Sequence, residues 1–309
     1  MAGQEIVLIT DHGSTEGSRA TLVAAVEMLT GQPPVLIDAR HFMTGGCGRV
    51  DGVDGVLRLE VPDEDLVVMA SAVLVYEIPP GARRSFEAFQ RRLRHHKAAC
   101  LGDDADAWRA ATDKDLTVRR FTRDGVAHME TVSLSHPSRA SATEAFERLG
   151  RDVWARPIVG MGGKDVFHIT TAVQLSEAAG YYAASGQDWL ISRDARNFNA
   201  DGQRHQFRAV VLDGRVVRVV EHIQADPHAP CNEAQGAVST VLAIDELPAG
   251  LQGLAICATR SLGLTLAGVD LAAESGGVVF EVNVHPAFGS VRGLETVAIP
   301  YVQAHLAML

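Results

Sequence analysis

The sequence predicts a protein of mixed class, α/β in its first third and α+β further on. Strand-like apolar runs alternate with helical patterns up to about residue 101, and this alternation changes around Gly102. Beyond Gly180 the pattern is antiparallel, because Asp213-Gly214 separates two β-rich runs and Asp-Gly is a strong hairpin signal. We therefore expect three parts, at residues 1–101, 102–186 and 187–309.

The N-terminal part is predicted to contain a parallel sheet covered by helices. Residues 6–10 and 35–38 read as strands, a helix is expected over 17–30, and the dense apolar run at 65–76 reads as a buried strand. A helix from Ala82 follows, with Phe86, Phe89 and Leu93 on one face. Strands and helices in this order typically build parallel sheets.

The middle part begins with two predicted helices, at residues 105–111 and 114–124. A short strand at 129–134, another helix and a strand at 153–158 follow. In the last part we expect a hairpin formed by residues 206–212 and 215–222, with Asp213-Gly214 as its turn.

A second hairpin, near the C-terminus, carries the most informative polar residues. Residues 268–271 and 278–283 read as strands joined across Gly276-Gly277. Asp270 lies on the first strand, and Glu281 and Asn283 share a face of the second because they are two residues apart. A solvated hairpin is the alternative, but acidic groups within so apolar a run need a partner. Three oxygen donors on adjacent strands therefore predict a Mg²⁺ site.

This hairpin resembles the C-terminal end of ATP-grasp enzymes, particularly the RimK-like carboxylate–amine ligases, which carry G-V-D, then M-E-V-N, then a Pro-Gly-containing turn. The resemblance covers roughly residues 102–309. It implies an ATP-grasp fold with a small N-terminal parallel α/β domain, a helix–strand lid and a C-terminal antiparallel α+β domain. By this resemblance Asp270, Glu281 and Asn283 hold two Mg²⁺ ions, which Mn²⁺ could replace, against the phosphates of ATP. His285 departs from the family pattern, and it either contacts substrate or caps the turn.

A glycine-rich segment follows the strand predicted at 153–158. Gly160, Gly162 and Gly163 would let the backbone approach a polyphosphate and direct N–H groups at it, although such loops also occur as plain hairpin turns. The segment is similar to the K-P-x-x-G-x-x-G loop of ATP-grasp enzymes, with Arg156 in place of the family's Lys. Arg keeps the positive charge and can hold phosphate oxygens through two N–H groups. Lys164 is either a second cation for ATP or a solvated side chain.

Two further segments resemble nucleotide-binding parts of the family. Lys114, at the start of a predicted helix, matches the Lys of a D-K-x-x-T segment that reaches the phosphates; on its own it would read as surface charge. Ser192 and Asp194 lie where the family's hinge strand contacts the nucleotide. This chain has no Glu in that strand, which runs over residues 189–194.

The remaining candidate residues lie in the C-terminal part. Arg208 matches the Arg of a D-x-R strand start that stabilises the transferring phosphoryl group and contacts substrate, while a structural salt bridge is its alternative. Asn232 occupies the place of the N-x-x-x-G segment over the phosphates, and Arg292 a place that often contacts substrate. Cys231 has no histidine at a telling spacing and is expected to be inert.

Composition narrows the functional classes. The net charge of −10 and a single basic cluster, at residues 91–97, argue against nucleic-acid binding. Four cysteines without C-x-x-C spacing argue against a zinc site and fit free thiols in a reducing cytoplasm. The sequence starts directly into a strand, and no apolar run reaches the roughly 18 residues that span a membrane. A cytoplasmic protein is expected, and a homo-oligomer stays open.

The resemblance implies an ATP-dependent carboxylate–amine ligase. Such an enzyme phosphorylates a small-molecule carboxylate to an acyl phosphate, which an amine such as an amino acid or peptide then attacks, releasing ADP and phosphate. Arg208 and Asn283 are the expected catalytic residues. Two alternatives remain: a non-catalytic nucleotide-binding protein on the same fold, and an ATP-grasp kinase that stops at a phosphorylated product.

Overall fold

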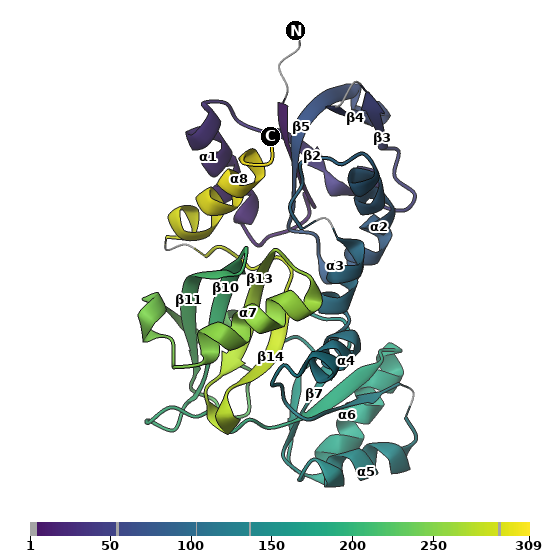
Figure 1. The fold of residues 1–309 in the computed structure, drawn as a ribbon. Coiled ribbons are helices and arrows are strands. Elements are labelled where there is room, and N and C mark those ends of the chain that lie inside the picture. The colour runs from purple at the N-terminus through teal and green to yellow at the C-terminus, as the bar shows by residue number, and fades with distance from the viewer. Residues whose placement is uncertain (1–4, 54–55, 103, 136, 290–291) are drawn as a thin grey trace. The chain divides into compact units, whose positions relative to one another are not determined.

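The computed structural model describes residues 5–53, 56–102, 104–135, 137–289 and 292–309 of the chain (Figure 1). The chain forms two compact units built from discontinuous segments. Unit 1 comprises Met1–Arg109, Gly263–Ala267 and Val284–Leu309, and unit 2 comprises Ala110–Leu262 and Gly268–Asn283. The division expected at residues 102 and 187 stays a prediction. Within the described ranges, every helix is too short or too polar to cross a bilayer.

Unit 1 is built on a five-stranded sheet with the strand order β2-β1-β5-β4-β3. The strands are β1 (Glu5–Thr10), β2 (Val35–Asp38), β3 (Arg49–Val53), β4 (Val56–Val61) and β5 (Leu66–Tyr76). Strand β1 pairs in parallel with both β2 and β5, and its central residues Val7, Leu8 and Ile9 are fully buried. The strands expected at 6–10, 35–38 and 65–76 are thereby confirmed.

The N-terminal sheet is parallel at β2, β1 and β5 and antiparallel at β4 and β3, a hairpin that the sequence analysis does not predict. Strand β4 pairs antiparallel with both β5 and β3. Its residues Leu57, Leu59 and Val61 are buried while those between them are only half-buried, which is the alternation of a strand with one covered face. The pattern over residues 49–61 is thus that of a hairpin, and an antiparallel hairpin needs no crossover helix.

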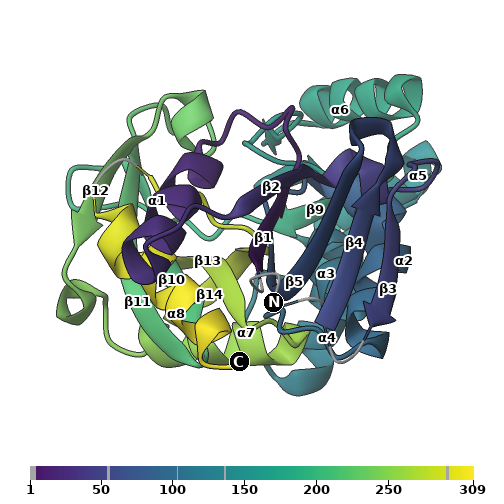
Figure 2. The ribbon, with the colours of Figure 1, turned by 90° about the horizontal axis from the view of Figure 1, so that it is seen from above.

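Helices complete unit 1. They are α1 (Ser18–Thr30), α2 (Pro80–His95), α8 (Ile299–Leu306), the short helices η1 (Ala39–Phe42), η2 (Pro62–Glu64) and η6 (Leu294–Ala298), and the start of α3 (Ala105–Thr112). Helix α1 and the C-terminal helix α8 lie side by side although they are separated by most of the chain (Figures 1 and 2). Phe86, Phe89 and Leu93 of α2 are buried, as expected from their spacing.

The smaller sheet of unit 2 is antiparallel, with the order β6-β9-β7-β8. It consists of β6 (Thr131–Leu134), β7 (Val153–Pro157), β8 (Phe167–Ile169) and β9 (Trp189–Arg193), accompanied by α4 (Lys114–Asp124), α5 (Arg139–Arg148) and α6 (Ala172–Ser185). Phe146, Tyr182 and Trp189 form its core. A capping box between Thr171 and Gln174 starts α6 at a defined residue, which fixes where β8 ends.

The larger sheet of unit 2 has the order β12-β11-β10-β13-β14. Its strands are β10 (Arg204–Leu212), β11 (Arg215–Gln224), β12 (Val238–Leu242), β13 (Leu266–Ala272) and β14 (Val278–Asn283). Helix α7 (Leu251–Leu262) covers one face (Figure 1), and η3 (Glu233–Gln235), η4 (Ile244–Glu246) and η5 (Glu274–Gly276) lie in the connections.

Both predicted hairpins of the larger sheet are present. Asp213 and Gly214 have positive φ of 47° and 72°, as a two-residue turn between twisted strands requires. Strands β13 and β14 pair antiparallel, with a β-bulge after Asp270. The mixed α/β and α+β class is confirmed. Helix α7 covers one face of the larger sheet, so the polar residues of its strands can lie on the opposite face.

Candidate active site

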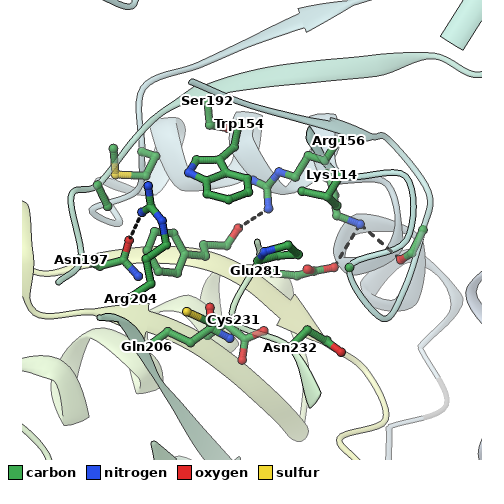
Figure 3. A pocket seen from close by; sticks show the side chains of 18 of the residues that line it. Lys114, Trp154, Arg156, Ser192, Asn197, Arg204, Gln206, Cys231, Asn232 and Glu281 are labelled. Atoms are coloured by element: carbon green, nitrogen blue, oxygen red, sulfur yellow. Dashed lines mark hydrogen bonds and ion pairs between the residues drawn. The ribbon is translucent and has the colours of Figure 1, made fainter. Parts of the chain in front are cut away.

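A cavity of about 140 Å³ lies within unit 2 and is lined by residues from both of its sheets (Figure 3). Its walls come from the start of α4, β7, β9, the glycine-rich loop, β10 and the β13–β14 hairpin. The following predicted site residues line it: Lys114, Arg156, Gly160, Gly163, Lys164, Ser192, Asn232, Asp270 and Glu281. Residues that are up to 167 positions apart in the sequence are thereby brought to one cavity.

The predicted metal ligands are neighbours. Asp270 of β13 lies directly opposite Glu281 of β14 in the strand register, and Asn283 lies opposite Gly268. The Asn283 side-chain amide donates a hydrogen bond to Asp270 Oδ2 at 3.3 Å, which leaves the amide oxygen of Asn283 available as a ligand. The hairpin thus gathers three oxygen-bearing side chains on one face, as the sequence predicts.

Lys114 neutralises one of these carboxylates. Its ammonium lies 3.0 Å from Glu281 Oε1 and donates a hydrogen bond to the Gly160 carbonyl oxygen at 3.3 Å. Burial raises the pKa of the Glu281 carboxyl, but Lys114 and Arg156 outweigh this effect and hold the pKa below its usual value. Lys114 is only 7 % exposed, so it is not the surface charge that its local sequence alone would suggest.

Arg208 neutralises the other carboxylate. Its guanidinium donates to both oxygens of Asp270, with Nε–Oδ1 of 2.7 Å and Nη2–Oδ2 of 2.9 Å. Burial lowers the pKa of Arg208, but Asp270 outweighs it and raises the pKa above its usual value. The structural salt bridge weighed for Arg208 therefore exists, although its partner is on β13 rather than across the β10–β11 hairpin. The catalytic role of Arg208 stays a prediction.

The glycine-rich loop packs against the segment that contains Asn232. Gly162 and Gly163 have positive φ, and a Cβ added to Gly163 would lie 3.0 Å from both Pro230 and Gln235. Gln235 donates a side-chain hydrogen bond to the Gly162 carbonyl oxygen at 3.2 Å. Only glycine allows so close an approach with this backbone conformation, so the two segments together form one wall of the cavity. Lys164 on this loop is exposed.

Arg156 has an unsatisfied buried nitrogen. It lies on β7 and donates from Nη1 to the Phe280 carbonyl oxygen at 2.9 Å, while its buried Nε has no hydrogen-bond partner among the described residues. Burial lowers the pKa of Arg156, opposed by the charges of Glu281 and Asp270. A buried cationic group with an unmet donor is expensive unless a ligand supplies the acceptor.

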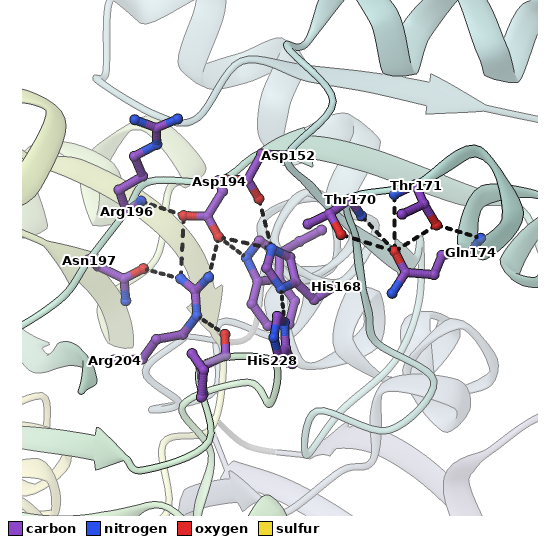
Figure 4. A network of polar contacts seen from close by, with 12 residues as sticks. Asp152, His168, Thr170, Thr171, Gln174, Asp194, Arg196, Asn197, Arg204 and His228 are labelled. Carbon is purple, nitrogen blue, oxygen red and sulfur yellow. Dashed lines mark hydrogen bonds and ion pairs between the residues drawn. The ribbon is translucent and has the colours of Figure 1, made fainter. Parts of the chain in front are cut away.

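Asp194 does not line the cavity, but it contacts Arg204, which does (Figure 4). Its carboxylate accepts a hydrogen bond from the Trp154 indole at 2.7 Å and lies 2.5 Å from Arg204 Nη2. The Arg204 guanidinium lies 4.9 Å from the Trp154 ring centroid and also donates to Asn197 at 3.1 Å. Asp194 thus positions Trp154 and Arg204, and direct binding of the nucleotide by Asp194 stays a prediction.

Several lining residues were not predicted. No sequence motif pointed to the lining residues Met129, Trp154, Asn197, Arg204 and Phe280. The sequence does contain a signal for Arg204. It is two residues from Gln206 and four from Arg208 along β10, so the three side chains share a face of the strand. Gln206 lines the cavity in the place of the family's acidic residue. Ser192 lines it as well and shares a hydrogen bond with Thr131 at 2.8 Å.

Cys231 also lines the cavity, and its chemistry is that of an apolar residue. The side chain is buried, and burial raises the pKa of the thiol to about 12. The nucleophile of cysteine chemistry is the thiolate, which is absent at neutral pH with such a pKa. The expectation that Cys231 is inert is therefore supported.

Two buried basic residues occupy the face of the larger sheet that carries Arg208. Register and strand alternation place Arg218 and His222 of β11 on this face. Arg218 Nε and Nη1 and His222 Nε2 have no hydrogen-bond partner among the described residues. Burial, and then the charge of Arg208, lowers the pKa of His222, so its ring is neutral at pH 7. Together with Arg204 and Arg208 of β10, this face thus offers three cationic guanidinium groups and a neutral imidazole.

The remaining substrate-binding candidates, His285 and Arg292, belong to unit 1. The His285 ring is buried between Tyr76 and Trp108, at centroid distances of 4.7 Å and 4.6 Å, and its Nδ1 accepts a hydrogen bond from the Ile78 N–H at 3.3 Å. Burial lowers the pKa of His285 well below its usual value. These contacts favour the structural alternative for His285. Arg292 is exposed, and substrate binding by either residue stays a prediction.

Comparison with known proteins agrees with this geometry. Among solved structures, D-cycloserine synthetase DcsG superimposes with a TM-score of 0.69 at 20% identity, covering 98% of each chain. The ATP-grasp ligase PsnB, complexed with a phosphomimetic variant of a minimal precursor, Mg and ADP, superimposes with a TM-score of 0.65 at 15% identity, covering 99% of this chain and 98% of PsnB. The protein therefore has the ATP-grasp fold, as the hairpin at residues 268–283 predicts.

The family match is more specific. Residues 158–299 match the model of the RimK-like ATP-grasp domain. A protein described as a "Probable alpha-L-glutamate ligase" from Histophilus somni (strain 2336) is 28% identical over 203 residues. That alignment spans 64% of this chain and 64% of the length of the relative.

Proposed function

We propose that the protein is an ATP-dependent carboxylate–amine ligase. The observation that carries this proposal is the pair of carboxylates, Asp270 and Glu281, held side by side by Arg208 and Lys114 next to a glycine-rich loop. This is a place where the β- and γ-phosphates of ATP and divalent cations can be bound together. The match of residues 158–299 to the RimK-like ATP-grasp domain supports the same reaction class.

The residues present fit a magnesium site. Asp270, Glu281 and Asn283 supply oxygen donors, which Mg²⁺ prefers, and each carboxylate already lies beside a cationic side chain. We propose two Mg²⁺ ions, replaceable by Mn²⁺. When bound, they offset the charge on the β- and γ-phosphates.

The cations around the cavity are proposed to orient ATP. Lys114 and the Arg156 Nε group would contact phosphate oxygens, together with backbone N–H groups of the loop at residues 160–163. The base would lie toward Trp154, Arg204 and Phe280, where apolar rings adjoin polar groups. ATP would thereby supply the acceptor that Arg156 lacks.

Both chemical steps of the reaction are proposed to take place at the face of the larger sheet that carries Arg208. An oxygen of the substrate carboxylate attacks the γ-phosphorus, the bond to the ADP oxygen breaks, and an acyl phosphate forms. An amine nitrogen then attacks the acyl carbon, loses a proton and expels phosphate. Arg208, and Arg218 with its two unmet donors, are the groups that would stabilise the negative charge of these species. We propose an amino acid or a peptide as the amine.

A product-release screen tests this function. Purified protein is incubated with ATP, Mg²⁺ and panels of amino acids and dipeptides, and ADP and free phosphate are measured separately. A ligase releases both in equal amounts, and only when carboxylate and amine are present. ADP without free phosphate would point to a kinase. ATP binding without ADP release under any condition would point to a non-catalytic nucleotide-binding protein.

Arg156→Ala is expected to weaken ATP binding about 10- to 100-fold. The reason is the loss of one charge-assisted hydrogen bond, which is worth roughly 1.5–3 kcal/mol. Calorimetric titration with a non-hydrolysable ATP analogue measures the change. Arg156→Lys should retain most of the affinity, and Arg139→Ala, which removes an exposed charge from α5 of the same unit, should change it less than about threefold. Equal effects of Arg156→Ala and Arg139→Ala would contradict this assignment.

A further inference from the structure

A second group of metal-binding side chains lies in unit 1. One ligand atom from each of His41, Cys47 and Asp63 lies within 4.8 Å of the other two. His41 belongs to η1, Cys47 follows in the loop before β3, and Asp63 belongs to η2 between β4 and β5. None of these residues takes part in the proposed ligase chemistry, so the group needs its own explanation.

The His41 ring is held in one orientation by the contacts that its two nitrogens make with Glu64 and Cys47. Nε2 lies 2.8 Å from Glu64 Oε1, and Nδ1 lies 3.5 Å from Cys47 Sγ. Histidines that bind metals usually have one nitrogen fixed by a carboxylate in this way, which leaves the other nitrogen with its lone pair free for the metal. In a tetrahedral zinc site, bonds of about 2.3 Å to sulfur and 2.0–2.1 Å to nitrogen would separate these two atoms by about 3.6 Å.

The loop that contains Cys47 is tightly built. A Cβ added to Gly46 would lie 2.2 Å from the His41 carbonyl oxygen, and one added to Gly48 would lie 2.7 Å from the same atom. The Gly48 N–H donates a hydrogen bond to that oxygen at 2.8 Å. The neighbouring Phe42 anchors η1 in the core by stacking on Phe89 at 4.3 Å. These two glycine positions place Cys47 next to His41.

The 3.5 Å distance between Cys47 Sγ and His41 Nδ1 would also fit a simple thiol–imidazole hydrogen bond. The position of Asp63 favours a metal site over this alternative. Its carboxylate is exposed, and it has no hydrogen bond or ion pair with the described residues. The other candidate group, Asp152, His168 and Asp194, differs in this respect (Figure 4). There, the Asp194 carboxylate is already paired with Arg204 and Trp154. In the unit 1 group, by contrast, the Asp63 carboxylate has no such cationic partner among the described residues.

We propose that Cys47, His41 and Asp63 bind Zn²⁺, with Glu64 orienting His41 and a fourth position open to water or an exogenous ligand. One sulfur, one nitrogen and one oxygen donor suit zinc rather than Mg²⁺ or Ca²⁺, which take oxygen ligands. The cysteine spacing could not indicate this site, because only one of its ligands is a cysteine. Bound zinc connects the loop before β3 to the turn between β4 and β5, and it stabilises unit 1.

The test uses the full-length protein, freed of metal by a chelator and kept in excess Mg²⁺ so that the oxygen-ligand site is occupied. Titration with Co²⁺, a spectroscopic substitute for zinc, should give a thiolate-to-cobalt charge-transfer band that saturates at one equivalent and is abolished by added Zn²⁺. Cys47→Ser should abolish the band, and Asp63→Asn should weaken Co²⁺ binding at least tenfold. Cys257→Ser, which removes the exposed thiol of α7, should leave the band unchanged.

Alkylation provides a second measurement that needs no variant. Zn²⁺ should slow the reaction of Cys47 with iodoacetamide at least tenfold while the rate at Cys257 stays constant, as measured by mass spectrometry. Absence of the charge-transfer band, its persistence in Cys47→Ser, or equal alkylation of Cys47 with and without Zn²⁺ would overturn the proposal. Fast alkylation of Cys47 that depends on His41 but not on metal would identify an activated thiol instead. None of these outcomes depends on ligase activity.

Discussion

Glu281→Gln is expected to abolish turnover while the protein stays folded. Gln keeps the size of the side chain but removes the negative charge that faces Lys114 at 3.0 Å. A neutral amide is a weaker ligand for Mg²⁺ than a carboxylate, so stabilisation of the phosphates in the transition state is lost. We expect kcat to fall by at least about 10³-fold, which corresponds to about 4 kcal/mol.

Steady-state ADP release and thermal unfolding, measured on the same preparation, separate catalysis from folding. Glu177→Gln is the matched control, because it removes one negative charge from an exposed position of α6 in the same unit. It should have wild-type kcat. If Glu281→Gln kept more than about a tenth of the wild-type turnover, the metal-ligand role of Glu281 would be refuted.

Arg208→Ala is expected to destabilise the metal-free protein by about 3–5 kcal/mol as well as to abolish activity. The variant leaves Asp270, which is 5 % exposed, as a buried carboxylate without its bidentate partner. Chemical denaturation monitored by circular dichroism measures the free energy of unfolding. Because Mg²⁺ would then be the remaining partner of Asp270, Mg²⁺ should raise the Tm of Arg208→Ala more than that of the wild type.

The double variant Arg208→Ala/Asp270→Asn isolates the origin of this loss. Removing the charge of Asp270 as well should recover most of the stability, since no unpaired charge remains buried, but it should not recover activity. An Arg208→Ala variant as stable as the wild type would mean that Asp270 is solvated and that the pair contributes little. Stability that the double variant does not recover would assign the loss to packing of the Arg208 side chain instead.

The placement of the three proposed metal ligands side by side could be predicted from sequence because its determinants are local. A Gly-Gly turn, two apolar runs and the alternation of side chains suffice to place Asp270, Glu281 and Asn283 on one face of one hairpin. The ion pairs with Lys114 and Arg208 could not be derived in this way. They depend on how α4 and β10 pack beside the hairpin, which spacing within the hairpin does not encode.

The part of the cavity where we propose that the nucleotide base binds was the hardest to predict from sequence, for a similar reason. Trp154, Arg204 and Phe280 come from three separate strands, and each would pass for an ordinary strand residue on its own. The β3–β4 hairpin was missed for a different reason. The sequence Val53-Asp54-Gly55-Val56 contains the same Asp-Gly signal as the hairpin at Asp213-Gly214, but the surrounding α/β alternation favoured a parallel sheet. Asp54 and Gly55 lie outside the described residues.

The interleaved composition of the two units has a consequence for biosynthesis. All residues of unit 2 precede Val284, whereas unit 1 needs residues 284–309, which include α8 beside α1 and the buried residues Tyr301 and His305. Synthesis on the ribosome therefore completes unit 2 first, while the N-terminal sheet and α1 still lack the contacts of α8. During this interval the nascent N-terminal segment exposes apolar surface, and it is the part of the chain on which a chaperone would act.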